Sequence, residues 1–307
     1  MGRDCDLLVV GGGPAGLTAA IYGRRAGLSV KVLEKGVPGG QINVTYELEN
    51  YPGFKRIGGA VLGRVMRDHA LHFGAELIGA QVLSVAREDE AFRCQTSEGE
   101  VASKAVIWAT GAEYRKLGAP GEAEFQGRGV SYCAVCDAAF FQDEVVAVVG
   151  GGNSAVEEAI YLTKFASKVY IVHRRDKFRA DKIVSDRALA NPKIEPVWNC
   201  VVEEIFGDEM VQGIRVKNVL SGEVKEIPVA GVFIFIGTKP NTEEIKGLVE
   251  LDEMGYVITD EEMRTSLPGL FAAGDVRKKS LRQVITAAAD GAIAAMSAYH
   301  YLEKSHG

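Results

Sequence analysis

The hydrophobic and polar positions near the start of the chain predict a strand, a glycine-rich turn, a helix and a second strand. Residues 7–10 are all apolar, and residues 11–16 read Gly-Gly-Gly-Pro-Ala-Gly. A helical pattern continues to Ala26, and a second short strand predicted at 30–33 ends in Glu34. The order of these segments predicts a β-α-β unit.

The turn of this unit has the G-x-G-x-x-G spacing, with Gly11, Gly13 and Gly16 at the glycine positions. Glycines here let a pyrophosphate approach the free N–H groups and the positive end of the helix dipole. Glu34 lies at the distance along the chain where a carboxylate accepts bonds from a ribose hydroxyl. We therefore expect a dinucleotide site at this turn.

The same pattern occurs a second time in the chain. Shifted by 139 positions, residues 11–35 align without a gap with residues 150–174 and are identical at seven of 25 positions. The apolar strand recurs at 145–149, and Ala155 replaces the third glycine, as the G-x-G-x-x-A form of the motif allows. The repeat predicts two dinucleotide sites in one chain.

The two copies differ at the position that would contact the ribose. Glu34 aligns with His173, which is followed by Arg174, Arg175 and Arg179. A carboxylate would repel a 2′-phosphate, whereas guanidinium groups bind one through charge-assisted hydrogen bonds. The second site is therefore expected to prefer NADP(H) over NAD(H).

The first site could hold either a nicotinamide dinucleotide or FAD. The loops at 39–41 and 49–53 are rich in small and amide residues, which lets backbone and amide groups approach a flat polar ring. A buried strand predicted at 269–273 leads to Asp275, which could bond a ribityl hydroxyl, and a helix is expected from about 281 to 302. The amino terminus of that helix would stabilise negative charge on a reduced flavin, so the pattern favours FAD.

A C-x-x-C motif followed by an acid lies between the two glycine turns, at Cys133, Cys136 and Asp137. A zinc site would need two more ligands with metal spacing, and the other cysteines are scattered singly. Two thiols on one turn can form and open a disulfide with little backbone movement, which suits a two-electron relay. Asp137 would be a proton donor for the departing thiolate.

Composition narrows the class of protein further. The 307 residues, 47% of them hydrophobic, suggest about two domains, and a net charge of −6 gives no indication of nucleic-acid binding. The longest uncharged stretch, 7–23, is short and broken by glycines and a proline, and residues 1–6 do not resemble a signal peptide. We expect a cytoplasmic protein with no membrane span.

His69 and His72 lack a third ligand, so no metal is expected.

The motifs together resemble the low-molecular-weight, bacterial-type thioredoxin reductases, in the class II pyridine nucleotide-disulfide oxidoreductase family, over essentially the whole chain. They read, in order, G-G-G-P-A-G, G-G-Q, E-N-Y-P-G-F, A-T-G, C-A-V-C-D, G-G-G-N-S-A-V-E-E-A, H-R-R-D-K-F-R-A and G-D-V-R-K-K-S-L-R-Q. The resemblance implies an α/β fold of two Rossmann-like, three-layer ββα domains with the NADPH domain inserted into the FAD domain. It also implies a homodimer.

The implied domain boundaries are 1–114 and 244–307 for the FAD domain and 115–243 for the NADPH domain, with hinge crossings at 109–111 and 237–240. Rotation of the inserted domain would present either the nicotinamide or the cysteine pair to the flavin.

The resemblance also assigns the site residues. FAD would contact Gly11, Gly13, Gly16, Glu34, Gln41, Asn50, Asp275, Arg282, Gln283 and Val284, and NADPH would contact Gly152, Asn153, Ser154, His173, Arg174, Arg175 and Arg179. Cys136 would face the flavin, Cys133 would exchange with thioredoxin, and Asp137 would be the acid. Ala138 departs from the glycine of many relatives, so an ordinary negative φ is predicted there.

These observations predict an NADPH-dependent flavoprotein disulfide reductase, a thioredoxin reductase. One alternative keeps the relay and changes the acceptor, to a glutaredoxin-like protein, a peroxidase partner or, for a dithiol oxidase, oxygen. Another is a non-catalytic flavin- and NADP-responsive regulator, against which the intact C-x-x-C-D sequence argues.

Overall fold

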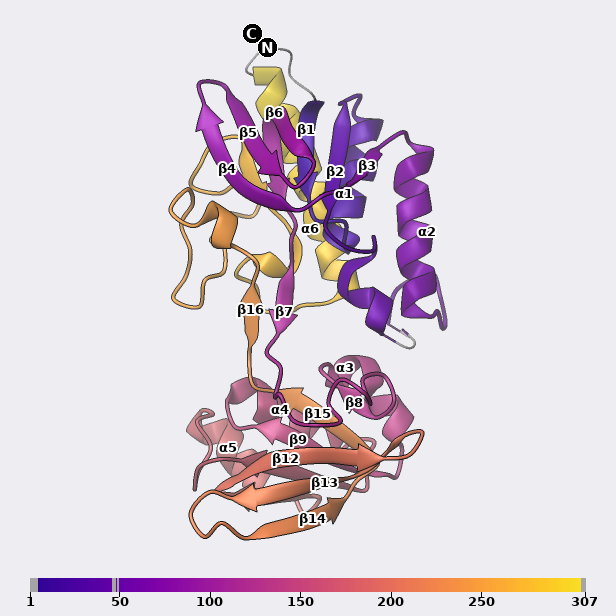
Figure 1. The fold of residues 1–307 in the computed structure, drawn as a ribbon, viewed down its shortest axis with the longest axis vertical. Coiled ribbons are helices and arrows are strands. Elements are labelled where there is room, and N and C mark those ends of the chain that lie inside the picture. Colours follow the sequence, from indigo (N-terminus) through magenta and orange to yellow (C-terminus); the bar gives the residue numbers. More distant parts are fainter. Residues whose placement is uncertain (1–4, 46–47, 49, 305–307) are drawn as a thin grey trace. The chain divides into compact units, whose positions relative to one another are not determined.

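The computed structural model describes residues 5–45, 48 and 50–304 of the chain (Figure 1). The first four residues and Glu49, the first residue of the predicted loop at 49–53, lie outside the described residues. No helix in the described ranges is long and apolar enough to cross a lipid bilayer.

The chain divides into two compact units. Unit 1 comprises Met1–Glu113 and Lys239–Gly307, and unit 2 comprises Tyr114–Thr238. The predicted boundaries after 114 and 243 lie one and five residues further along the chain than these divisions. Residues after Thr238 belong with unit 1 because the carbonyl of Asn241 accepts hydrogen bonds from Trp108 Nε1 at 2.8 Å and Thr110 Oγ1 at 2.7 Å.

Unit 1 is built from two stretches of the chain. Its elements are β1 (Cys5–Val10), α1 (Pro14–Arg25), β2 (Val30–Glu34), the 3-10 helix η1 (Gly40–Val44), α2 (Gly59–His72), β3 (Glu76–Gly79), β4 (Val82–Glu88), β5 (Ala91–Thr96), β6 (Gly99–Trp108) and β7 (Ala112–Tyr114), then β16 (Thr238–Pro240), η3 (Glu243–Ile245), β17 (Leu270–Ala272), η4 (Gly274–Val276) and α6 (Val284–Lys304). β7 pairs with β16, so the two crossings between the units run side by side.

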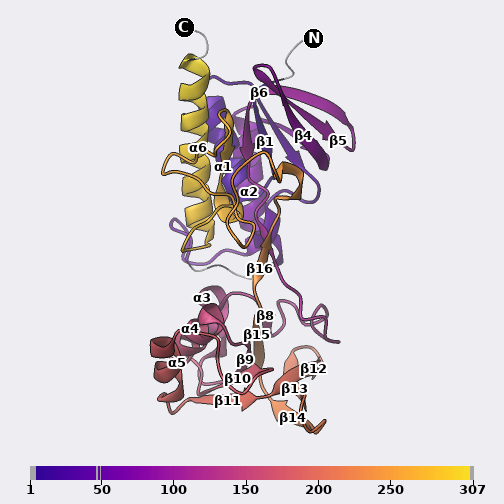
Figure 2. The same ribbon diagram turned by 90° about the vertical axis from the view of Figure 1, so that its left-hand side faces the viewer.

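The sheet of unit 1 explains why its first strand is buried on both faces. Within the described residues the strand order is β3-β2-β1-β6-β5-β4, with β17 paired to the end of β6. Leu7 and Val9 of β1 face a core that includes residues of α1, α2 and α6, whereas Leu8 and Val10 face a second core that includes residues of β4 and β5. The result is three layers, with the helices on one face of the parallel strands (Figure 2).

Helices α1 and α6 pack closely because their contact face carries small residues. A Cβ atom at Gly291 of α6 would overlap the carbonyl oxygen of Ala15 in α1, so only glycine allows the two backbones this distance. This contact places Gly291, in the second turn of α6, beside the first turn of α1, in which Ala15 lies. The predicted helix from about 281 begins at Val284.

Unit 2 repeats the layered plan. Its elements are β8 (Val130–Ser131), α3 (Ala134–Asp137), η2 (Ala138–Phe141), β9 (Val145–Gly150), α4 (Asn153–Leu162), β10 (Lys168–His173), α5 (Lys182–Leu189), β11 (Ile194–Trp198), β12 (Cys200–Gly207), β13 (Val211–Asn218), β14 (Val224–Pro228) and β15 (Gly231–Phe235). In the described part of this unit the parallel order is β11-β10-β9-β15-β8, and β12-β13-β14 form an antiparallel sheet.

The two faces of this parallel sheet also have different partners. Val146 and Val148 of β9 pack in a core with residues of α4 and α5, and Ala147 and Val149 pack in a core with residues of β12 and β13. This arrangement confirms the predicted fold class of two three-layer ββα domains, one inserted into the other. Ala138 has φ −56°, which confirms the predicted negative value.

Candidate active site

Cys133 and Cys136 are joined by a disulfide at the start of α3, with their Cα atoms 5.3 Å apart. Cys133 is the residue before the first helical turn, and its Sγ accepts the backbone N–H of Cys136 at 3.2 Å. An N–H group aimed at sulfur stabilises negative charge on it. The geometry therefore favours a thiolate on Cys133 once the disulfide is opened.

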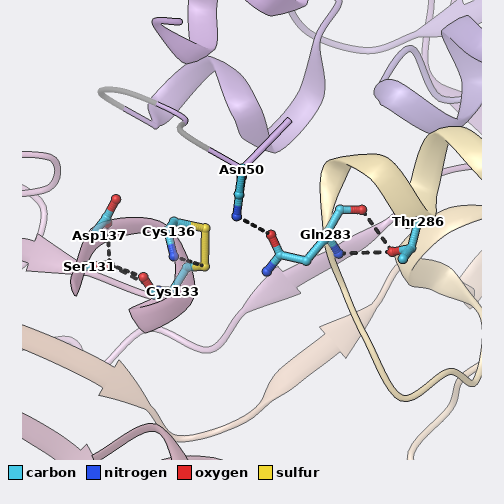
Figure 3. Close-up of a disulfide and its surroundings, with 7 residues drawn as sticks. All are labelled: Asn50, Ser131, Cys133, Cys136, Asp137, Gln283 and Thr286. Atoms are coloured by element: carbon cyan, nitrogen blue, oxygen red, sulfur yellow. Dashed lines mark hydrogen bonds between the residues drawn. A yellow bond between two sulfur atoms is a disulfide. The ribbon is translucent and has the colours of Figure 1, made fainter. Parts of the chain in front are cut away.

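Asp137 follows the cysteine pair and is held by a serine (Figure 3). Ser131 Oγ lies 2.5 Å from Asp137 Oδ2, and the same hydroxyl accepts the N–H of Cys133 at 3.1 Å. Burial raises the pKa of the Asp137 carboxyl, and the hydrogen bond from Ser131 opposes this rise. A carboxyl group with a raised pKa beside a disulfide can hold a proton for thiol exchange.

Tyr132 anchors the cysteine turn on its other side. Its hydroxyl donates to Glu122 Oε1 at 2.7 Å, and Glu122 also accepts the backbone N–H groups of Leu117 and Gly118 at 2.8 and 2.7 Å. Burial and the neighbouring carboxylate raise the pKa of Tyr132, so the phenol stays protonated. These hydrogen bonds fix the cysteine turn to residues 117–122, which follow β7.

The other three cysteines, Cys5, Cys94 and Cys200, are buried thiols. Burial raises the pKa of Cys94 to about 12 and also raises the pKa of Cys200. Thiols that stay protonated are poor nucleophiles. Cys94 and Cys200 are therefore poor candidates for thiol chemistry at neutral pH.

The first glycine turn gives each of its three glycines a different reason to lack a side chain. Gly11 has φ +105°, and a Cβ there would overlap the backbone of Ala109. A Cβ on Gly16 would overlap the Gly11 carbonyl oxygen, whereas the nearest atom to a Cβ on Gly13 is 4.0 Å away. Gly13 therefore faces open space, as a residue beside a phosphate should. Among the described residues no side chain caps α1, which leaves its first N–H groups for a ligand.

The Glu34 carboxylate is hydrogen-bonded to the backbone of this turn. Its Oε2 accepts the N–H of Gly12 and its Oε1 accepts the N–H of Gly36, both at 2.7 Å. A carboxylate has about four acceptor positions, so capacity remains for a ribose hydroxyl. These two backbone hydrogen bonds fix the position of the Glu34 carboxylate beside the first glycine turn.

The turn after β17 carries a buried polar group that the fold does not satisfy. Asp275 Oδ1 is buried without a hydrogen-bond partner in the described structure, and Lys279 Nζ lies 4.0 Å away. Burial raises the pKa of Asp275, opposed by the charges of Lys279 and Arg282. Arg282 lies 4.3 Å over the Tyr256 ring and has a buried Nε with no partner among the described residues. A hydroxyl-rich ligand would satisfy such groups.

Asp290 of α6 holds this turn in place. The buried carboxylate accepts the N–H of Gly274 at 3.1 Å and bonds Arg277 Nη1 at 3.1 Å and Lys279 Nζ at 2.8 Å. Gln283 precedes α6, and its N–H donates to Thr286 Oγ1 at 3.2 Å. The amino terminus of α6 is thereby fixed next to the Gly274–Val276 turn.

Two predicted amide residues are tied to distant backbone or side chains. Gln41 Nε2 donates to the Ala112 carbonyl at 2.7 Å, and Asn50 Nδ2 donates to Gln283 Oε1 at 3.1 Å (Figure 3). Asn50 and Gln283 are therefore brought together from opposite ends of the chain. Val284 begins α6 directly after this pair.

The second glycine turn reproduces the first. A Cβ on Gly150 would overlap the Phe235 carbonyl oxygen, whereas the nearest atom to a Cβ on Gly152 is Arg179 Nη2 at 3.9 Å. Ala155 packs against the turn, with its Cβ 2.7 Å from a Cβ placed on Gly150. As in α1, no side chain of the described ranges caps α4, so its first N–H groups can bind a phosphate.

The residues that follow β10 separate into a buried histidine and exposed arginines. His173 is 6% exposed, and its Nε2 has no hydrogen-bond partner within the described ranges. Burial lowers its pKa, as do the charges of Arg179, Arg175 and Arg174, so the imidazole is neutral at pH 7. The three arginines are exposed and form the positively charged cluster predicted to follow residue 173.

Asn153 makes protein contacts instead of pointing freely from the loop. Its Oδ1 accepts the N–H of Asp181 at 2.7 Å, and its Nδ2 donates to Asp181 Oδ2 at 3.0 Å. These bonds tie the start of α4 to the segment that carries Arg179. Ser154, the next residue, is exposed.

Three polar residues near these sites were not predicted from the sequence. Ser131 and Asp290 are described above, and Glu158 of α4 has a buried Oε2 without a partner in the described residues. Burial and the charge of Glu157 raise the pKa of Glu158 to about 7. Only Ser131 had a local signal, its place two residues before Cys133; the other two depend on tertiary burial.

A model of the pyridine nucleotide-disulphide oxidoreductase family matches residues 5–291, and the chain belongs to this family. Thioredoxin reductases are among its relatives: that of Listeria monocytogenes is 51% identical over 300 residues, covering 97% of this chain and 94% of the relative. That of Bacillus subtilis is 49% identical over 300 residues, with 97% and 95% covered. The crystal structure of thioredoxin reductase from Streptococcus pyogenes matches with a TM-score of 0.94 and 50% identity over 98% of each chain. The resemblance found in the sequence is confirmed.

Proposed function

We propose that this protein is a flavoprotein disulfide reductase that uses NADPH to reduce thioredoxin. The observation that carries the proposal is the Cys133–Cys136 disulfide, followed directly by a partly buried carboxyl group, in a unit that also contains a glycine turn for a dinucleotide. The names of its relatives support thioredoxin as the acceptor.

Unit 1 fits FAD. Gly13 leaves room for the pyrophosphate, Glu34 has acceptor capacity for the ribose, and the unsatisfied Asp275 Oδ1 suits a ribityl hydroxyl. The other residues proposed to contact FAD are Gly11, Gly16, Gln41, Asn50, Arg282, Gln283 and Val284. The bound flavin would supply the two-electron chemistry between NADPH and the disulfide.

Unit 2 fits NADPH. Gly152, Asn153 and Ser154 lie at the uncapped start of α4, where the pyrophosphate would bind. The exposed guanidinium groups of Arg174, Arg175 and Arg179 would bind the 2′-phosphate, with the neutral ring of His173 beneath the loop. The buried Glu158 carboxyl, with its raised pKa, is a candidate partner for an amide group of the nucleotide.

The residues of the redox turn suggest how the dithiol reacts. Cys133, stabilised as a thiolate by the Cys136 N–H, would attack the thioredoxin disulfide and form a mixed disulfide, and one thioredoxin sulfur would leave as a thiol. Cys136 would then attack Cys133, which restores the enzyme disulfide and releases the second thioredoxin thiol. Asp137 would receive a proton from one thiol and return it to a departing sulfur, so two electrons move and no net proton is consumed.

The decisive experiment is anaerobic coenzyme oxidation with thioredoxin as acceptor, comparing NADPH with NADH and native protein with Cys133→Ser. We expect rapid turnover with NADPH that the serine variant abolishes, while coenzyme still reduces the flavin. Flavin reduction without thioredoxin reduction in the native protein would remove thioredoxin as the acceptor and direct the search to another disulfide. The proposal extends to a homodimer, which sedimentation would test.

A further inference from the structure

The Ser131 hydroxyl has more hydrogen-bond partners than its single proton can serve at one time. It lies 2.5 Å from Asp137 Oδ2 and 3.3 Å from the Cys133 carbonyl oxygen, and it accepts the N–H of Cys133 at 3.1 Å. A hydroxyl donates one hydrogen bond and accepts two. Which acceptor it serves must therefore depend on whether Asp137 carries a proton.

Both protonation states of Asp137 can be satisfied without moving a heavy atom. When the carboxylate is ionised, the Ser131 hydroxyl donates to Oδ2. When the carboxyl is protonated, Oδ2 donates to Ser131 Oγ, and the hydroxyl proton turns to the Cys133 carbonyl. Ser131 is only 5% exposed, so water does not readily replace any of these bonds.

We infer that Ser131 is a positioning residue for thiol–disulfide exchange, which keeps the Asp137 carboxyl in place while that carboxyl gains and loses its proton. The inference rests on the proposed function and adds a residue to it. Ser131 itself takes no proton away, since it returns to its starting state whenever Asp137 does. The exchange therefore balances as described above.

The surroundings of Asp137 leave Ser131 as its main polar support. Within the described structure, the pKa of Asp137 responds to burial and to the Ser131 hydrogen bond, and to no charged side chain. Helix α4, which packs against α3, carries Glu157 and Glu158, but neither contributes to that pKa. Strand β8 and η2 carry no charged residue. Loss of the hydroxyl should therefore destabilise the ionised carboxyl and raise its pKa further.

The test uses the full-length, FAD-loaded protein and three variants: Ser131→Ala, Ser131→Thr, and the control Ser185→Ala. Ser185 lies in the same unit and donates to the Ala180 carbonyl. Rapid mixing measures flavin reduction by NADPH, and separately the oxidation of dithiol enzyme by thioredoxin across a pH series. For Ser131→Ala we expect the second step to slow on the order of tenfold, as loss of a hydrogen bond to a charged group implies, with its pH profile moved to higher pH. The threonine and control variants should keep the native profile.

The outcomes separate this inference from the function on which it rests. A native rate and pH profile in Ser131→Ala would overturn the inference while leaving the reductase function intact, whereas failure of the native protein to reduce thioredoxin would remove the function itself. If Ser131→Ala does not fold, Ser131→Gly also lacks the hydroxyl and takes its place. In an Asp137→Asn background, Ser131→Ala should leave the pH profile unchanged; a further shift there would contradict the inference.

Discussion

Gly151 lies directly against the imidazole ring of His173, so close that a Cβ atom on the glycine would overlap the ring. The histidine ends β10 and fills the space beneath the second glycine turn. A side chain on Gly151 would therefore clash with the buried imidazole ring. A Cβ atom on the neighbouring Gly152 would have no atom closer than 3.9 Å. The two adjacent glycines should respond differently to the same mutation.

We predict that Gly151→Ala lowers the melting temperature of the protein in the absence of nucleotide, because the added methyl group must displace the buried His173 ring. The expected cost is about 1–3 kcal/mol, as for other overpacked sites. Gly152→Ala should leave the melting temperature unchanged and weaken NADPH binding alone. Equal melting temperatures for Gly151→Ala and native protein would show that the ring is not confined.

Neutralising the arginines after His173 should change coenzyme preference. With Arg174 and Arg175 both replaced by glutamine, we predict that the KM for NADPH rises by one or more decades, since each charged hydrogen bond contributes roughly 1.5–3 kcal/mol. The KM for NADH should change little because that coenzyme lacks the 2′-phosphate. Arg187→Gln, on α5, is the matched control. An equal loss with both coenzymes would contradict the assignment.

The sequence predicted both glycine turns and the redox turn because these motifs are local. Residues 11–16 and 150–155 take their conformation from glycines whose spacing can be read directly, and the disulfide joins residues three apart. The surroundings of Asp137 could be predicted only in part. Its proposed role follows from its place in the motif, but its burial and its contact with Ser131 depend on how β8 packs. The sequence therefore predicts features formed by neighbouring residues and misses contacts that depend on tertiary packing.

The same limit applies more strongly to the last segment. Asp275 could be predicted because it follows a strand at a recognisable turn. Asp290 could not, because its partners Arg277 and Lys279 meet it only when α6 folds back over the turn. In the sequence it is one of two acids in a helix rich in alanine.

Asp290→Asn should destabilise unit 1 and weaken FAD retention. The substitution keeps the size of the side chain and removes the charge that compensates the mostly buried Arg277 and Lys279, so we expect a loss of about 3 kcal/mol in unfolding free energy. Denaturant unfolding and flavin content after gel filtration measure the two effects. The exposed pair Lys182–Asp186 provides the control, since Lys182→Gln should cost about 0.5 kcal/mol or less.

Acid should remove a contribution of Asp6. Burial alone would raise the pKa of this carboxyl, but hydrogen bonds from Lys104 and Ser29 outweigh it and lower the pKa from 3.8 to about 2. A carboxyl whose folded pKa is depressed stabilises the fold above its unfolded pKa and loses that contribution as pH falls toward the folded value. The stability advantage of native protein over Asp6→Asn should therefore shrink as pH falls from about 5 to about 2. An advantage independent of pH would contradict this assignment.

The pairing of β7 with β16 places the entry and exit of unit 2 on neighbouring strands. Neighbouring strands lie about 5 Å apart. A short turn could therefore join the two stretches of unit 1 at the point where unit 2 interrupts them. Unit 2 is therefore inserted at a single point of unit 1, and removing it would leave the other strands and helices of unit 1 uninterrupted.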